Sequence, residues 1–240
     1  MNLTILQIND THSYFELHNE LYWVGHRASH KKSGGYARIS TLFKEIRNEK
    51  NGKVITLDNG DTIHGTFPAV NSKGEALIPI LNELAIDAMT AHWEFAYGPD
   101  NFRNIVNKLN FPMIAINCYE KETNKLVFSP FHIIDIKDLR IGIIGISATI
   151  VDKTMPKHFS KGIYFTLGNE ELPIYIKKLR ESEKVDLIIV LSHLGYPQEL
   201  KLAKEVGGID VLLSGHTHNR LYEAVVVNGS IIMQSGCHGS

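Results

Sequence analysis

Short apolar runs rich in β-branched residues recur along the chain, and longer amphipathic stretches separate them. Several runs are apolar at every position, which is typical of strands that are covered on both faces of a sheet. This alternation predicts an α/β fold built of layers. The predicted strands are Leu3–Ile8, Val54–Asp58, Met113–Asn117, Phe131–Ile136, Arg140–Ile146, Asp186–Ser192, Val211–Ser214, Ala224–Val227 and Ile231–Gln234. The predicted helices are Tyr36–Lys50, Glu75–Leu84, Pro99–Leu109, Asn169–Glu183 and Pro197–Glu205.

Two stretches, residues 13–34 and 147–168, show no regular period and are expected to be long loops. Long ordered loops on an α/β frame often carry functional residues. The sequence contains no internal repeat and no linker rich in glycine and serine. A single domain over residues 1–240 is therefore the simplest prediction.

The composition narrows the classes of partner. The formal net charge is -1, which gives no long-range attraction to a nucleic acid polymer or to an anionic membrane. The chain enters its first strand without an export signal, and no apolar run approaches the length of a membrane span. We therefore expect a cytoplasmic protein that binds neither membrane nor nucleic acid. Cys118 and Cys237 are far apart in sequence and are expected to be reduced thiols.

Residues of the kinds that bind metals follow four of the predicted core strands. Open α/β sheets bind ligands beyond the carboxyl ends of their strands, so these side chains are expected to meet at one edge. Each single case has an ordinary explanation, because most histidines bind no metal and an aspartate beside a glycine is usually part of a turn. Four such endings in one chain favour a shared site. The residues are Asp10 and His12, Asp61, His193, and His216 and His218.

The carboxylates and imidazoles in this set predict a site for two divalent metal ions. Such a combination holds manganese, iron, zinc or cobalt well, and no soft thiolate accompanies it. A carboxylate such as Asp61 can bridge two cations, and the glycines beside Asp61 and His216 let the backbone turn tightly near a ligand. We expect manganese, with zinc, iron and cobalt as alternatives.

Five short segments occur in the order and spacing of a known series of motifs. They are Asp10–His12, Gly34–Arg38, Gly60–Gly65, Ser192–Gly195 and Gly215–His218. As a set, they resemble the motifs of the calcineurin-like metallophosphoesterases, most closely those of the 5'-nucleotidase and 2',3'-cyclic phosphodiesterase branch. The resemblance runs through nearly the whole chain and implies a four-layer α-β-β-α sandwich. It implies a metal held by Asp10, His12 and His218, a second metal held by His193 and His216, and Asp61 as the bridge.

The resemblance also implies an activity. The expected reaction is hydrolysis of a phosphate ester by a hydroxide that bridges two metals, in a phosphomonoesterase of the 5'-nucleotidase kind or in a phosphodiesterase. The expected substrate is a small phosphate ester or a nucleotide. Full 5'-nucleotidases carry a further C-terminal domain that stacks the nucleoside base, and this chain is expected to be the catalytic domain without it.

One segment, Ala91–Gly98, departs from the family motif Gly-Asn-His-Glu-Phe-Asp-x-Gly. An ungapped alignment puts His92 in place of the asparagine ligand, Trp93 in place of the catalytic histidine and Ala96 in place of the aspartate that orients it. His92 is then expected to complete the second metal's ligands, and tryptophan cannot act as a general acid. A gapped alignment makes His92 the catalytic histidine instead. Asp61 and His92 are thus the residues expected to act in catalysis.

The departure leaves two alternative functions open. The His-Trp-Glu-Phe sequence, with Ser235–Gly239, resembles the thiosulfohydrolase branch of this superfamily, which removes sulfate from a cysteine S-thiosulfonate. The loss of the histidine and aspartate pair also permits a non-catalytic module that only binds metal. Two further residues are candidates for substrate binding: His64, three residues after Asp61, and Arg38, near the start of a predicted helix.

Overall fold

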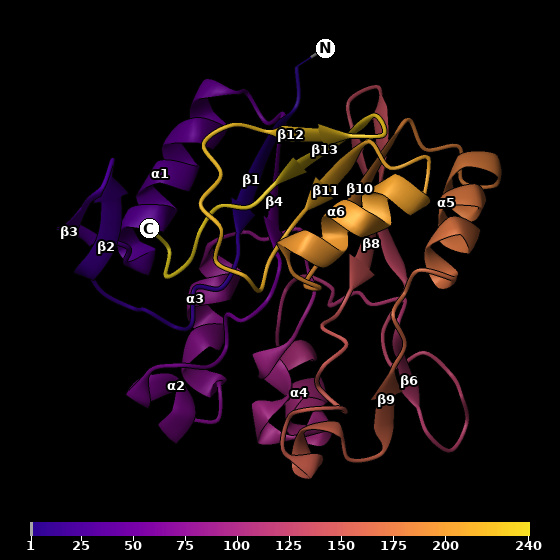
Figure 1. Cartoon of the computed structure of the whole chain (residues 1–240), viewed down its shortest axis with the longest axis horizontal. Coiled ribbons are helices and arrows are strands. Elements are labelled where there is room, and N and C mark those ends of the chain that lie inside the picture. Colours follow the sequence, from indigo (N-terminus) through magenta and orange to yellow (C-terminus); the bar gives the residue numbers. More distant parts are fainter. Residues whose placement is uncertain (1) are drawn as a thin grey trace.

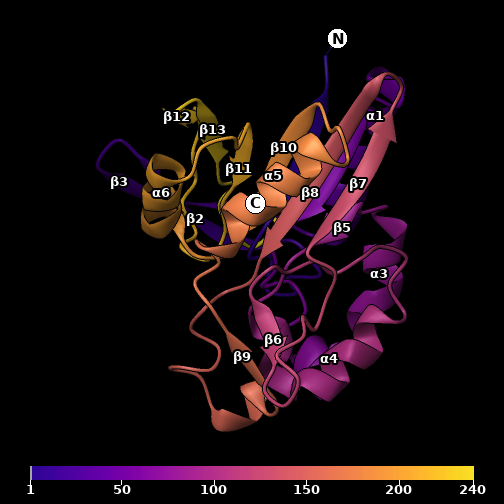
Figure 2. The same ribbon diagram turned by 90° about the vertical axis from the view of Figure 1, so that its right-hand side faces the viewer.

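The computed structural model describes residues 2–240, and its centre consists of two β-sheets that lie between helices (Figures 1 and 2). The smaller sheet is parallel and contains, in spatial order, β1 (Thr4–Ile8), β4 (Val54–Asp58) and β5 (Ala88–Met89). The larger sheet is antiparallel only at its two edges. Its spatial order is β12 (Val225–Val227), β13 (Ser230–Met233), β11 (Val211–Leu213), β10 (Leu187–Ser192), β8 (Leu139–Ile146) and β7 (Phe131–Ile136).

Hydrophobic clusters separate the layers. The middle cluster lies between the two sheets and contains Ile55 of β4 and Ile189 of β10. The next residue along β10, Ile188, belongs instead to a cluster under α5 (Glu171–Glu181) and α6 (Tyr196–Glu205). Because successive side chains of a strand point to opposite faces, a strand covered on both sides is apolar at every position.

A third cluster packs α1 (Tyr36–Glu49) and α3 (Ile78–Glu83) against the outer face of the smaller sheet. It contains Phe43 of α1, Leu81 of α3 and Leu6 of β1. The layers therefore follow the order helix, sheet, sheet, helix (Figure 2). This order confirms the α/β four-layer α-β-β-α architecture expected from the sequence.

Most predicted elements occur where the sequence places them. The strands β4 and β7 match the prediction residue for residue, and α4 (Pro99–Val106) begins at the expected proline. The helices α1, α5 and α6 differ from the prediction only at their ends. The region predicted as one helix over 75–84 is divided into a 3₁₀ turn at Glu75–Leu77 and the helix α3, whose first turn contains Pro79. Proline favours the first turn of a helix and cannot continue a preceding one.

The prediction of a loop over residues 13–34 is wrong. This stretch contains a hairpin of β2 (His18–Val24) and β3 (Arg27–Ser33), joined by Gly25 and His26. Nearly all of its residues are exposed or only half-buried. Since neither face of the hairpin is consistently apolar, the alternation that marks a strand is missing from its sequence.

Other differences concern short elements. In place of the predicted strand over 113–117, only Met113 and Ile114 pair, each through an isolated bridge. The expected loop over 147–168 contains a 3₁₀ turn at Lys157–Ser160 and the strand β9 (Ile163–Phe165), which pairs with β6 (Cys118–Glu120). The helix α2 (Phe67–Asn71) and the strand β5 were not predicted. Elements of two to five residues carry too little periodicity to be recognised.

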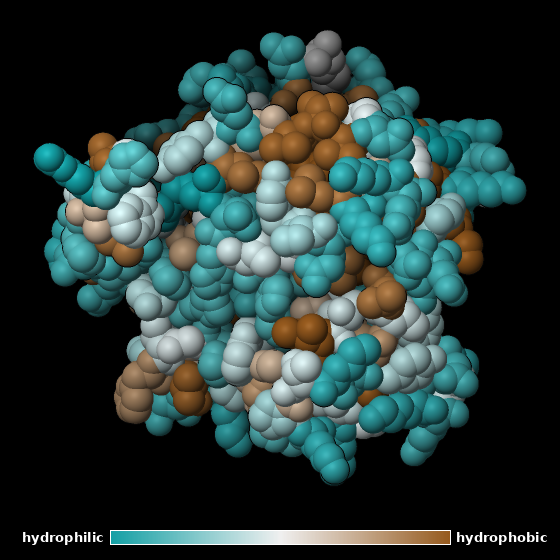
Figure 3. All heavy atoms as spheres, viewed as in Figure 1, coloured by the Kyte–Doolittle hydropathy of each residue, from teal (hydrophilic) through white to brown (hydrophobic). Residues whose placement is uncertain are grey.

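The surface shown in Figure 3 is mostly polar, and hydrophobic residues gather on its upper part. Val226 of β12 and Ile231 of β13 are 66% and 44% exposed. No helix within residues 2–240 combines the length and the apolar character that crossing a bilayer requires.

Candidate metal centre

The metal-binding residue types predicted from the sequence lie at one edge of the two sheets. Parallel strands in each sheet end there, so the residues that follow them meet. Five strands contribute: β1, β4 and β5 from the smaller sheet, and β10 and β11 from the larger. The residues that follow these strands are Asp10 and His12, Asp61, His92, His193, and His216 and His218.

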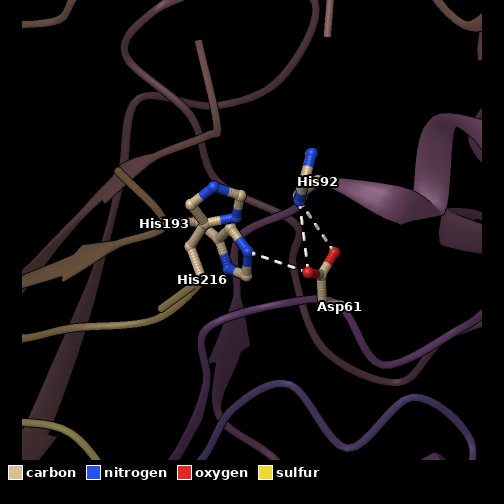
Figure 4. A group of neighbouring side chains, drawn as sticks. All are labelled: Asp61, His92, His193 and His216. Carbon is tan, nitrogen blue, oxygen red and sulfur yellow. Dashed lines mark hydrogen bonds and ion pairs between the residues drawn. The ribbon is translucent and has the colours of Figure 1, made fainter. Parts of the chain in front are cut away.

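One group consists of Asp61, His92, His193 and His216, which point toward a common centre (Figure 4). One ligand atom of each lies within 4.8 Å of those of the others. His92 Nδ1 lies 3.1 Å from Asp61 Oδ1, and His193 Nε2 lies 3.2 Å from Asp61 Oδ2. Such a set of one carboxylate and three imidazoles suits a borderline divalent cation.

A second group, Asp10, His12 and His218, adjoins the first. His218 Nε2 lies 3.4 Å from Asp10 Oδ1 and 3.2 Å from His12 Nε2. The carboxylate of Asp61 faces both groups, because its Oδ2 atom is also 3.8 Å from His12 Nε2. Asp10 Oδ1 is likewise 3.7 Å from His193 Nε2. The two groups therefore form one continuous centre with Asp61 between them.

Several buried nitrogens at this centre fit a metal. His216 Nδ1 is buried and has no hydrogen-bond partner among residues 2–240, whereas His193 Nε2 and His92 Nδ1 face the carboxylate of Asp61. A buried polar atom without a partner destabilises a fold by about 1–3 kcal/mol, so His216 Nδ1 needs an explanation. A cation bound beside Asp61 would accept its lone pair.

The backbone is also unusual at this edge. Five of the seven residues have positive φ angles, although none of them is glycine. Non-glycine residues adopt this conformation rarely, and such strain concentrates at functional sites. The angles are 49° at Asp10, 47° at His12, 55° at Asp61, 74° at His216 and 56° at His218.

Two residues hold the candidate ligands in place. His193 Nδ1–H donates to the backbone carbonyl of Asn59 at 2.7 Å, which leaves Nε2 facing Asp61. The buried carboxylate of Glu94 accepts four backbone N–H groups, including those of Asp61 and His92. Neither role was predicted. Glu94 belongs to the family motif, and its presence there could have indicated that it has a role at the site.

Charge at the centre shifts several pKa values. Burial alone would raise the pKa of Asp61, but the neighbouring His193 and His92 hold it well below its ordinary value. Burial would lower the pKa of His193, but the carboxylates of Asp61 and Asp10 raise it to about 10. Burial, together with the charges of His193 and His92, lowers the pKa of His216 to about 4. A neutral His216 can bind a cation without first losing a proton.

The two residues predicted to bind substrate lie in different places. The ring of His64 stacks on that of Trp93, with centroids 4.7 Å apart, and the backbone N–H of Trp93 donates to Asp61 Oδ1. His64 is therefore beside the centre. Arg38 is exposed on α1 and lines a cavity of about 600 Å³ whose lining includes none of the seven candidate ligands.

Comparisons with known proteins agree with this arrangement. The family model of the calcineurin-like phosphoesterases matches residues 3–220. Over 237 residues, the chain is 29% identical to a 5'-nucleotidase of Vibrio cholerae, covering 90% of this chain and 40% of that protein. Over 228 residues, it is 32% identical to the snake venom 5'-nucleotidase of Crotalus adamanteus, covering 92% of this chain and 37% of that protein. The chain thus spans about two fifths of these relatives.

Solved structures share the fold. The sulfate thiohydrolase SoxB of Thermus thermophilus superposes with a TM-score of 0.91 at 21% identity, covering 99% of this chain and 52% of that one. A 5'-nucleotidase precursor of Thermus thermophilus superposes with a TM-score of 0.81 at 25% identity, covering 99% and 49%. The family match, the sequence relatives and the shared fold agree with the residues that follow the strands. The chain belongs to the calcineurin-like phosphoesterase family.

Proposed function

We propose that the chain hydrolyses phosphate esters with two divalent metal ions. The observation that carries this proposal is the convergence of three imidazoles on the buried carboxylate of Asp61, with His216 Nδ1 buried and without a hydrogen-bond partner among residues 2–240. Asp61 would hold both cations, with His92, His193 and His216 as further ligands of one and Asp10, His12 and His218 as ligands of the other. Manganese is the proposed metal, and the same carboxylate and imidazole donors also suit zinc, iron and cobalt.

Two cations at these positions would supply a hydroxide nucleophile at neutral pH and positive charge beside the phosphoryl oxygens. The chain supplies the geometry. Asn59 and Glu94 fix His193, Asp61 and His92 before any ligand binds. Preorganised groups of this kind lower the barrier because they need not rearrange during the reaction.

Trp93 determines how the leaving group departs. It stands where the family motif has its catalytic histidine, and its indole can donate a hydrogen bond but cannot give up a proton to an alkoxide. A positioned general acid contributes about 10²- to 10⁴-fold. We therefore propose two kinds of substrate. The first is an ester with a good leaving group. The second is a small phosphate ester or nucleotide whose leaving group takes its proton from solvent. His64, stacked on Trp93, would contact the substrate there, and Arg38 would act only on a substrate that extends over α1.

Leaving-group dependence provides a first test. We expect kcat/KM for a p-nitrophenyl phosphate to exceed that for a simple alkyl phosphate by at least about a hundredfold, because no side chain at Trp93 protonates the alkoxide. Trp93→Phe should leave this ratio unchanged, since the indole transfers no proton. Equal rates on the two esters would contradict the assigned role of Trp93.

Metal binding is expected to release protons. In the metal-free protein, a hydrogen bond to Asp10 and one to Cys237 raise the pKa of His218 to about 10, and the pKa of His193 is also about 10. Both imidazoles are therefore protonated at pH 7 and must lose a proton before they bind a cation. Metal affinity should rise as the pH rises from about 6 to 8. A pH indicator in weakly buffered solution measures the release, and affinity that falls with rising pH would contradict the ligand assignment.

A second candidate function rests on the His92–Trp93 sequence, which is similar to that of the thiosulfohydrolases. The deciding experiment strips the protein of metal, reloads it with manganese and presents p-nitrophenyl phosphate, bis-p-nitrophenyl phosphate and a peptide with a cysteine S-thiosulfonate. We expect manganese-dependent turnover of at least one phosphate ester, and its loss in His216→Ala. Turnover of the thiosulfonate alone would replace the proposal, and metal binding without any turnover would indicate a binding module.

A further inference from the structure

A separate group of metal-ligating side chains lies beside the candidate centre and takes no part in it. His18 and Glu20 are alternate residues of β2, so they lie on the same face of the hairpin. His238 follows β13, more than two hundred residues later. His18 Nε2 lies 3.1 Å from Glu20 Oε2, and His238 Nδ1 lies 2.9 Å from the same oxygen. All three ligand atoms lie within 4.8 Å of one another.

The orientation of His18 favours a cation at this place. Its Nδ1 atom lies 3.3 Å from the backbone carbonyl oxygen of Glu16, which can only accept a hydrogen bond. Nδ1 therefore carries the proton in the neutral ring, and Nε2 presents a lone pair to the carboxylate of Glu20. Two facing lone pairs repel each other unless a proton on Nε2 or a metal ion lies between them. The carbonyl that orients the ring is the kind of support that metal-binding histidines have.

The spacing and the surroundings also fit. Zinc bonds to imidazole and carboxylate are about 2.0–2.2 Å long, so neighbouring ligand atoms lie about 3 Å apart, as they do around Glu20 Oε2. The side chains of His18, Glu20 and His238 are only 15%, 12% and 25% exposed. The ring of Tyr14 lies against both imidazoles, with centroid distances of 4.4 and 4.3 Å.

The backbone leaves room for His18 at this position. A Cβ atom at Gly34 would lie 2.4 Å from His18 Cε1 and 2.7 Å from the carbonyl oxygen of His238, so any larger residue would push the two segments apart. Gly34 also has a positive φ angle of 74°. The hairpin and the C-terminal segment lie side by side (Figure 1), and Gly34 permits their close approach at the three ligand atoms.

We propose that His18 Nε2, Glu20 Oε2 and His238 Nδ1 bind one further divalent cation of the zinc type. Two imidazoles and one carboxylate leave open positions for water or for an oxygen of a bound anion. The ring centroid of His238 lies 5.9 Å from that of His12 and 5.7 Å from that of His218, so this cation lies at the rim of the candidate centre. It joins the β2–β3 hairpin to the C-terminal segment and adds positive charge where an anionic substrate would approach.

Cys237 defines a competing arrangement. Its Sγ atom lies 3.6 Å from His238 Nδ1, and Cys237, His218 and His238 also bring ligand atoms within 4.8 Å of one another. That arrangement would use the same nitrogen of His238 and would share His218 with the candidate centre. The two ligand sets share only His238, so substitutions at Glu20 and Cys237 distinguish them.

The test counts zinc per chain after equilibrium dialysis of the full chain against zinc. We expect Glu20→Gln to bind one zinc fewer than the wild-type protein, because its neutral amide is a weaker ligand. His30→Gln is the matched control, since His30 is exposed on β3 outside the cluster, and it should bind as much zinc as the wild type. A urea midpoint of the metal-free Glu20→Gln protein equal to that of the wild type shows that the variant is folded. The expected difference between the wild type and Glu20→Gln is one zinc ion per chain. This difference is the same whether or not the neighbouring centre holds two metal ions.

Two results would overturn the proposal. If Glu20→Gln binds as much zinc as the wild type, the carboxylate only holds the two histidines by hydrogen bonds. If Cys237→Ser loses one zinc while Glu20→Gln does not, the cation belongs to the arrangement around Cys237. Retention of all zinc in Cys237→Ser, together with the loss in Glu20→Gln, is the expected outcome.

Discussion

Replacing Asp61 with asparagine is expected to lower kcat for phosphate ester hydrolysis by at least about a thousandfold, equivalent to about 4 kcal/mol. The carboxylate faces ligands of both groups, with Oδ2 3.2 Å from His193 Nε2 and 3.8 Å from His12 Nε2. An amide offers one oxygen and turns its NH₂ group toward the other cation. The variant should therefore no longer hold the two metal ions side by side. The positive charge that they supply at the reaction site should be lost with them.

Steady-state kinetics with manganese in excess, and metal analysis of the same sample, measure this effect. Asp100→Asn is a suitable control, because that side chain is 95% exposed and lies on α4. It should retain wild-type activity. An Asp61→Asn variant with more than about a tenth of wild-type activity would contradict the bridging role.

Replacing Glu94 with glutamine is expected to lower the free energy of unfolding by roughly 2–6 kcal/mol. One carboxylate oxygen accepts the N–H groups of Thr62 and Ile63, and the other accepts those of Asp61 and His92. Glutamine has one accepting oxygen, so two buried N–H groups would lose their partner at about 1–3 kcal/mol each. The loop that positions Asp61 and His92 should loosen, and metal affinity should fall with it.

Urea denaturation of the metal-free protein measures this loss without interference from bound metal. Glu83→Gln provides the control, because Glu83 is 66% exposed and pairs with Lys44 on the surface. Its urea midpoint should match that of the wild type. A Glu94→Gln variant that also unfolds at the wild-type midpoint would show that these four hydrogen bonds do not stabilise the fold.

The sheets were predictable because their strands are covered on both faces. Residues such as Ile188 and Ile189 belong to different hydrophobic clusters, so the sequence is apolar at both positions. The candidate ligands were predictable for a related reason. All but His92 follow within a few residues of a predicted strand, and parallel strands bring their ends together whatever the details of packing. His92 follows the short strand β5, which was not predicted, and only the family motif indicated it.

The remaining features depend on contacts that no local pattern records. The β2–β3 hairpin has polar residues on both faces, so its alternation is hidden. Glu94 acts through four backbone groups, and backbone groups are the same in every residue. The contact between Glu20 and His238 joins positions more than two hundred residues apart. Only the folded chain brings these segments together.

Anomalous diffraction from manganese-loaded crystals would locate the two cations that we propose on either side of Asp61. We expect two manganese peaks about 3.5–4 Å apart, one on each side of the Asp61 carboxylate. The first should lie among His92, His193 and His216, and the second beside Asp10. A single peak next to Asp61 in protein that hydrolyses phosphate esters with manganese would contradict the account.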